Sequence, residues 1–151
     1  MTFTTAHLLN SIAGILKSRY PDYPVYTSPS QQGIDVPCFF VALMPSTISD
    51  EVGEKYLRDV GIDVVFIQER NLPNGNSQIY QVQDFFDESF SSIPYSDGSE
   101  EIIPLHTFEC RSSIEDQELH YQFHVRQRVR APYTPSFMQV LEDNNVKIKE
   151  Q

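Results

Sequence analysis

The sequence is poor in basic residues. It carries 11 lysines and arginines against 21 aspartates and glutamates, which gives a formal net charge of −10. Contact with a nucleic-acid backbone or with an anionic membrane surface requires clustered Lys and Arg side chains, and this composition does not supply them. The charge balance therefore argues against specific nucleic-acid binding and against membrane docking, and it favours solubility.

Cysteines and long apolar runs are also scarce. The two cysteines, Cys38 and Cys110, lie in apolar stretches and show no disulfide pattern, which is typical of a reducing compartment. The N-terminal residues lack the basic start and the cleavage site of a signal peptide. No apolar run approaches the ~18 residues that span a bilayer. We therefore expect a soluble protein that is made in a cytoplasm.

The motifs that mark common enzyme sites are missing as well. There is no phosphate-binding loop, no Rossmann glycine pattern, and no HExxH, CxxC or GxSxG motif. Cys38 could act as a nucleophile, but its apolar neighbours Pro37 and Phe39 predict a buried and inert thiol, because burial raises the thiol pKa. We therefore expect no catalytic residues and no cofactor.

A metal site is also not expected. His120 and His124 are four residues apart, a spacing that suits a shared metal ion on a helix. The apolar residues that alternate with them predict a strand instead, and on a strand the two side chains lie about 13 Å apart. The acidic residues are scattered, and no pair of them indicates a general acid–base site.

Two helices are predicted from the spacing of apolar residues. Leu8, Ile12 and Leu16 form a stripe in the first helix, with Thr4 as its N-cap. The second helix is predicted over residues 77–92, and its apolar face is formed by Ile79, Val82, Phe86, Phe90 and Ile93. Its phenylalanines need a large apolar partner, most simply a sheet.

The strands are predicted at residues 24–27, 37–43, 56–68, 101–110 and 118–129. The run 37–43 is apolar on both faces, which is typical of a central strand covered on both sides. Gly61, within the longest run, indicates a bulge or a close backbone approach. A turn over 112–116 would join the last two strands as a hairpin.

The order of these elements is helix, three strands, helix, two strands. Because the strands cluster and the helices are few, we predict an α+β fold with a mostly antiparallel sheet and two packed helices. Residues 1–131 form this single domain. The pattern changes after Ala131, and we predict that residues 132–151 form a C-terminal extension.

One charged surface stands out in the last predicted strand. Arg126, Arg128 and Arg130 point to the same side as His120 and His124, whereas the segment 97–118 carries seven acids and one arginine. A solvated outer face explains this pattern, and so does a polar contact surface. If the basic face of one copy meets the acidic edge of the next, the contact is head-to-tail and can close a ring.

Several blocks of the sequence resemble the tail terminator proteins of phages, prophages and phage-tail-like particles of Gram-positive bacteria. The most specific block runs from Gln32-Gly33 to Pro37-Cys38-Phe39-Phe40-Val41, after Tyr23-Pro24-Val25-Tyr26. The resemblance continues through Tyr56-Leu57-Arg58, the helix near 79–90, the strand near 121–129 and the C-terminal Pro135, Met138 and Leu141. It spans nearly the whole chain.

The resemblance implies a structural protein without catalytic residues. Tail terminators of this kind form hexameric rings that sit on the last ring of tail tube protein and stop its polymerisation. They then offer a surface to the head connector, or to the sheath end of a contractile tail. The implied location is the host bacterial cytoplasm during assembly, and later the head-proximal end of the tail.

The contact residues that we predict lie on loops, on the charged strand and in the extension. The segments 44–55 and 69–77 are read as loops, and the chain from Pro132 onward could order on a neighbour. The candidate interface residues are Arg126, Arg128, Arg130, Arg70, Asn71, Glu51, Glu54, Met138 and Leu141.

Three other functions remain open from the sequence. A head–tail joining or tail completion protein would bind the connector and not the tube. A binding module of a cellular complex would be monomeric and would ignore tube protein. A hydrolase that uses Cys38 would need that thiol to be exposed and reactive.

Overall fold

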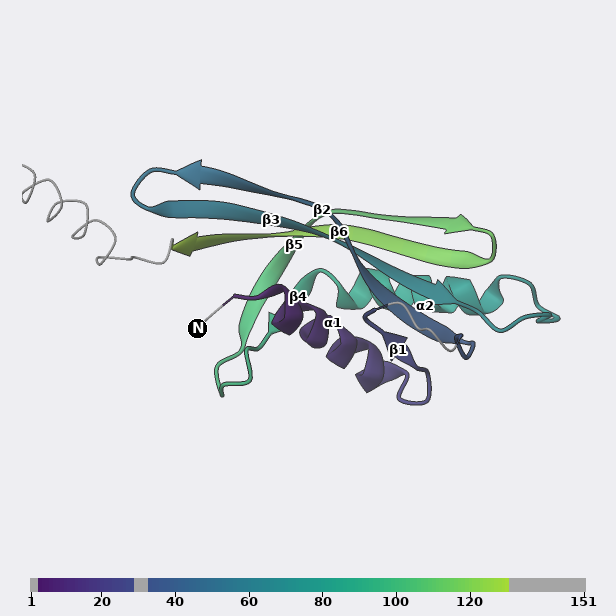
Figure 1. Cartoon of the computed structure of the whole chain (residues 1–151). Helices are drawn as coiled ribbons and strands as arrows, with labels where there is room; N and C mark the ends of the chain where they lie inside the picture. Colours follow the sequence, from purple (N-terminus) through teal and green to yellow (C-terminus); the bar gives the residue numbers. More distant parts are fainter. Residues whose placement is uncertain (1–2, 29–32, 131–151) are drawn as a thin grey trace, which may run out of the picture.

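A computed structural model describes residues 3–28 and 33–130, which form one six-stranded sheet with two helices on one of its faces (Figure 1). The helices are α1 (Thr5–Arg19) and α2 (Ser77–Ser89). The strand order is β1-β2-β3-β6-β5-β4, and every neighbouring pair is antiparallel except the parallel pair β1 and β2. The predicted α+β class with a mostly antiparallel sheet is confirmed. The boundary at residue 131 lies at the edge of the described residues, so the extension stays a prediction.

Helix α1 forms as its sequence pattern predicts. The Thr4 hydroxyl accepts a hydrogen bond from the backbone N–H of His7 at 3.2 Å, which caps the first turn. Leu8, Ile12 and Leu16 are fully buried against the sheet. The apolar stripe therefore faces the core, as is usual for an amphipathic helix in a two-layer domain.

Helix α2 ends earlier than predicted. It stops at Ser89, and the residues that follow form β4 (Ser92–Tyr95), a strand that the sequence analysis missed. Ile93 was assigned to the apolar face of the helix because it lies three residues after Phe90. In the structure both side chains are fully buried, but Ile93 reaches the core from a strand that pairs with β5. A strand residue that faces the core shortly after a helix can fall on the helical spacing of apolar residues. The sequence pattern then does not show where the helix ends.

The long hairpin of β2 (Cys38–Glu51) and β3 (Lys55–Ile67) corrects two predictions. The segment 44–55 is not a loop, because all of it except the short turn after Glu51 is strand. The strand predicted over 37–43 is also not covered on both faces along its whole length, since the Leu43 side chain is 52% exposed. The second half of β2 is polar, and it is a strand because it pairs with β3 along its length. The run predicted over 56–68 is confirmed as β3.

The second hairpin joins β5 (Ile103–Glu115) to β6 (Glu118–Arg130). Its turn is Asp116 and Gln117, both with positive φ, so it is tighter than the predicted turn over 112–116. The short strand β1 (Val25–Tyr26) pairs only with Phe39 and Phe40 at the start of β2.

A bulge interrupts each outer strand of the four-stranded centre. In β2 the register shifts between Met44 and Thr47, and in β5 it shifts between Phe108 and Arg111. Both shifts flank the row in which Gly61 pairs with His124. Bulges bend a strand and increase its twist, so the sheet changes direction along this row.

The core is rich in aromatic rings. Phe39 and Phe66 from the sheet meet Phe86 and Phe90 from the end of α2, with adjacent ring centroids 5.1 to 6.0 Å apart. Such pairs add about 0.5–1.5 kcal/mol each beyond the area they bury. Among the described residues, no helix combines the length and apolar character needed to cross a bilayer.

Candidate assembly surfaces

The face of the sheet that carries no helix is polar at its centre. Along β6 the residues alternate between the buried Leu119, Tyr121, Phe123 and Val125 on the helix side and partly exposed polar residues on the other side. This confirms that His120, His124 and Arg126 share one face. Asp59 and Asp63 of β3 lie on the same face and pair with them.

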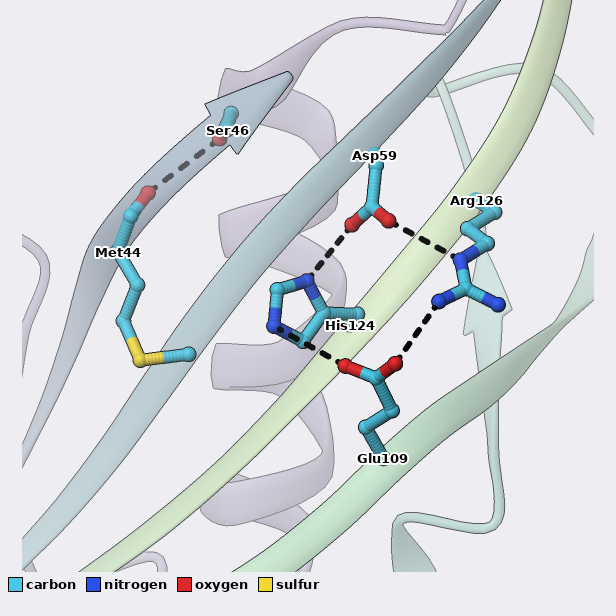
Figure 2. A network of polar contacts seen from close by, with 6 residues as sticks. All are labelled: Met44, Ser46, Asp59, Glu109, His124 and Arg126. Atoms are coloured by element: carbon cyan, nitrogen blue, oxygen red, sulfur yellow. Dashed lines mark hydrogen bonds and ion pairs between the residues drawn. The ribbon is translucent and has the colours of Figure 1, made fainter.

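Asp59, His124 and Arg126 form a closed network with Glu109 of β5 (Figure 2). Arg126 donates from Nε to Asp59 Oδ2 at 3.0 Å and from Nη2 to Glu109 Oε1 at 3.1 Å. His124 Nδ1 donates to Asp59 Oδ1 at 2.6 Å, and its Nε2 lies 3.8 Å from Glu109 Oε2. The network joins three strands at the row where the sheet bends.

The bulge in β5 places Glu109 in this network. Glu109 has a φ of 56°, a backbone conformation that costs free energy for any residue other than glycine. Its carboxylate gains two cationic or polar partners there, and Arg126 also stacks over the ring of Phe108, with Cζ 4.7 Å from the centroid. These contacts offset part of the cost of the bulged backbone.

The network holds Asp59 in its charged form. Partial burial opposes ionisation, but the hydrogen bonds and charges of Arg126 and His124 outweigh it, so the pKa of Asp59 is lowered. The hydrogen bonds that Arg126 donates to Asp59 and Glu109, and the charges of these carboxylates, likewise raise the pKa of Arg126. Both partners are therefore fully ionised at neutral pH.

A second histidine is held between two carboxylates further along β6. His120 Nδ1 lies 3.0 Å from Asp63 Oδ2, and its Nε2 lies 3.3 Å from Glu118 Oε2. Partial burial disfavours the imidazolium, but the two carboxylates outweigh it and raise the pKa of His120. The other oxygen of Asp63 is buried and has no hydrogen-bond partner among the described residues.

Two of the three arginines of the predicted basic face are paired with carboxylates of the same chain. Arg128 is 70% exposed, yet its Nε donates to Glu51 Oε2 at 2.9 Å. Arg126 has two carboxylate partners, as described above. Arg130 ends β6 opposite Lys55, and its side chain lies outside the described residues. The sequence showed the three arginines on one face, but it could not show which acids would reach them.

The other candidate interface residues lie far apart in the fold. Glu51 and Glu54 lie at the turn of the β2–β3 hairpin. Arg70 and Asn71 are exposed in the loop between β3 and α2, at the opposite end of β3, where the predicted loop is confirmed. The structure therefore does not bring these pairs together. Met138 and Leu141 lie outside the described residues.

The two cysteines differ from each other. Cys38 is fully buried, and burial raises the pKa of its thiol to about 11, as predicted for an inert side chain. Cys110 is exposed on the β5 bulge, so the prediction of apolar surroundings was wrong for this residue. Its Sγ still lies 3.3 Å from the hydroxyl of Thr107. In the described part of the chain, no cluster of three or more His, Cys, Asp or Glu residues has the arrangement of a metal site.

The sheet has two long edges that no described strand covers. On one side β1 stops after pairing with Phe40, which leaves residues 41–51 of β2 unpaired at their outer edge. On the other side β4 pairs only up to His106, which leaves residues 108–115 of β5 unpaired. Sequence reasoning missed these edges, because it read the outer half of β2 as a loop.

An apolar groove of about 360 Å³ runs beside the first free edge. It lies between α1 and β2 and is lined mainly by Leu9, Phe40, Val41 and Leu43. An exposed strand edge beside an apolar groove is a surface that suits an added strand, because the edge supplies hydrogen bonds and the groove accepts side chains.

The sequence profile of one family, described as phage tail terminator protein, matches residues 7–135. A comparison with curated proteins finds no match. Among solved structures, one similar chain comes from the virion of a native gene transfer agent particle, with 14% identity and a TM-score of 0.47 over 83% of this chain and 93% of that chain. A likeness this distant carries no argument about function. The family profile, in contrast, covers most of the 151 residues, and the chain belongs to the phage tail terminator protein family.

Proposed function

We propose that the protein caps the tail tube as a ring of six copies and stops tube polymerisation. Family membership supports a structural role in a phage tail, in assembly with other phage structural proteins. The ring, its stoichiometry and the capping step are our proposal. The observation that carries it is the pair of free edges on opposite sides of the sheet.

The direction of the strands makes these edges compatible with each other. From β2 through β3 and β6 to β5 each step is antiparallel, so β2 and β5 run in opposite directions. In a ring related by rotation, β5 of one copy therefore meets β2 of the next in antiparallel orientation. Each copy offers one edge and receives the other, which is a head-to-tail contact that can close. Closure also removes both exposed edges, which would otherwise promote aggregation.

The polar face suits the lumen of such a ring. Both helices cover the other face, which leaves the face with Asp59, Asp63 and Arg126 open to solvent (Figure 1). On it Arg126 and Arg128 are each paired with a carboxylate of the same chain. A channel lined in this way lets DNA pass without gripping its phosphates, since counterion release requires free cationic side chains.

The role that we propose is structural and not catalytic. The ring has two rims, of which one contacts the tail tube and the other faces the head connector or the sheath end. The ring assembles in the host cytoplasm and stays at the head-proximal end of the tail. The buried Cys38 thiol, with a pKa raised to about 11, gives no support to the hydrolase alternative.

Native mass measurement combined with hydrogen exchange tests the ring. We expect a hexamer, alone or on tube ends, in which the amides of residues 41–51 and 108–115 gain protection relative to the monomer. The amides between β3 and β6 serve as an internal control, because they are already paired in one copy. A hexamer whose two edges exchange as fast as in the monomer would contradict edge-to-edge closure.

A further inference from the structure

The two ends of the sheet carry hairpins of different character. One is the arm, defined as residues 44–58 of the β2–β3 hairpin, which extends past both helices (Figure 1). The other is the β5–β6 tip, defined as residues 112–118. It lies alongside α2, where Gln83 donates a hydrogen bond to Ser112 at 2.9 Å. Beyond its base, where Arg58 contacts the start of α1, the arm stands free of the helical layer.

The arm carries apolar side chains that the described fold leaves in water. Val52, in the turn, is 97% exposed, and Ile48 is 67% exposed. The opposite turn is Asp116 and Gln117, and its nearest large apolar residue, Ile114, is 38% exposed. The Val52 side chain buries almost no surface in this turn, and turns favour Gly, Asn and Asp for their backbone preferences.

Acidic side chains surround the exposed apolar residues of the arm. Asp50 and Glu54 flank Val52, are exposed, and make no ion pair within the described residues. Glu51 differs, because Arg128 holds it at 2.9 Å. The tip therefore presents an apolar centre with a rim that carries Asp50 and Glu54, and Lys55 is the one basic residue beside them, opposite Glu51.

The arm also makes side-chain contacts with the rest of the chain before any partner binds. The Glu51–Arg128 pair ties its outer part to β6. Nearer the body, Arg58 donates to the Thr5 hydroxyl at 2.8 Å and lies over the ring of Phe3. A contact element that is already ordered loses little conformational entropy on binding, which favours affinity.

We propose that the arm is the contact between the ring and the last ring of tail tube protein, in which it occupies an apolar socket bordered by Lys or Arg side chains. This inference rests on the proposed capping function. A cap must adhere on one rim and must not recruit tube protein on the other. The arm has the exposed apolar and acidic side chains that an adhesive rim requires. The β5–β6 tip has no apolar residue in its turn, and it contacts α2.

The test compares matched variants at the two ends of the sheet. Ile48→Thr/Val52→Thr keeps β-branched side chains on the arm and removes apolar surface. Ile114→Thr makes the same change at the other tip. The readout is binding to preassembled tail tubes, together with the native mass of the free protein. We expect the arm variant to keep the oligomeric mass of the wild type and to bind tube ends at least tenfold more weakly, since six contacts are lost together. The Ile114→Thr variant should bind as the wild type does.

A charge variant tests the rim of the socket. Asp50→Asn/Glu54→Gln should weaken tube binding at low salt and flatten its dependence on ionic strength, because exposed charges act through a screened field. Glu115→Gln/Asp116→Asn is the control at the β5–β6 tip, and it should change neither property.

Several results would overturn the assignment while leaving the capping function intact. Loss of tube binding in Ile114→Thr, or unchanged binding in the arm variant, would place the tube contact elsewhere. Loss of the ring in the arm variant would mean that the side chains of Ile48 and Val52 contribute to the contact between copies, in addition to the backbone edge of β2. A fall in the melting temperature of the arm variant would mean that Ile48 and Val52 stabilise the fold of the free protein, and that they are not reserved for a partner. Failure of the wild type to recognise tube ends would instead remove the proposed function itself.

Discussion

Gly61 and His124 face each other across β3 and β6, and the imidazole occupies space that a side chain on Gly61 would need. A Cβ atom at Gly61 would lie 3.3 Å from His124 Cε1 and 3.2 Å from the carbonyl oxygen of Pro45. It would also lie 3.0 Å from Met44 Cβ, on the bulged strand. The close approach that the sequence indicated at this glycine is therefore confirmed, and it coincides with the bend of the sheet.

Replacing Gly61 should destabilise the fold. Gly61→Ala should lower the free energy of unfolding by roughly 1–3 kcal/mol, because the Pro45 backbone and Met44 Cβ cannot swing aside like the end of a flexible side chain. Gly14→Ala is the control, since no atom lies within 4 Å of its Cβ position and the residue is exposed in α1. That change should stabilise the helix by roughly 0.5–1 kcal/mol. Urea unfolding measures both, and equal effects would contradict the packing described here.

Asp59 should matter more for stability than Glu51. Asp59→Asn weakens the hydrogen bonds to His124 and Arg126 and should cost roughly 1–3 kcal/mol, whereas Glu51→Gln removes one exposed ion pair and should cost less than about 1 kcal/mol. Because the pKa of Asp59 is lowered in the folded state, its contribution is present above pH about 4 and disappears as the pH falls through the lowered value. Unfolding of both variants at pH 7 and at acid pH tests whether the loss of stability is larger for Asp59→Asn than for Glu51→Gln. A constant difference between wild type and Asp59→Asn at every pH would count against it.

His120 should make stability fall as the pH rises. Its pKa is raised by Asp63 and Glu118, so its contribution is complete below the unfolded value of about 6.5 and is lost as the pH rises through the folded value. His120→Gln should remove this decline above pH 6.5. His106→Gln, on an exposed part of β5, is the control and should retain it. Thermal unfolding across this pH range provides the measurement, and an unchanged decline in His120→Gln would refute the assignment.

The two thiols should react at very different rates. Cys110 is exposed and should be alkylated by iodoacetamide in the native monomer, whereas Cys38 is buried, with a pKa of about 11, and should react only after unfolding. Mass spectrometry of the labelled peptides identifies each site. Rapid native labelling of Cys38 would restore the hydrolase alternative that the sequence left open.

Much of the fold could be predicted from apolar periodicity. The stripe of α1, the alternation of β6 and the long run of β3 each follow one period over many residues, so they were placed almost correctly. The outer half of β2 and the strand β4 were missed because they are defined by pairing with β3 and β5 and not by a local pattern. Their hydrogen-bond partners are distant in the sequence.

The candidate surfaces were predicted less completely for a similar reason. The alternation in β6 placed Arg126 and Arg128 on one face correctly. Their carboxylate partners come from β3, from the β5 bulge and from the end of β2, and the sequence contains no signal for those pairings. The free edges of β2 and β5 follow from the lengths of their neighbours, which only the pairing of strands reveals.

The length of tail tubes grown in the presence of this protein tests the central claim most directly. Tube protein that polymerises alone should give tubes without a defined end point, and electron microscopy can follow their length as the protein is added. We predict that growth stops at a fixed low ratio of protein to tube ends, with one ring of six copies on each terminated end. Tubes that continue to grow at saturating concentrations, with no ring at either end, would contradict the capping function.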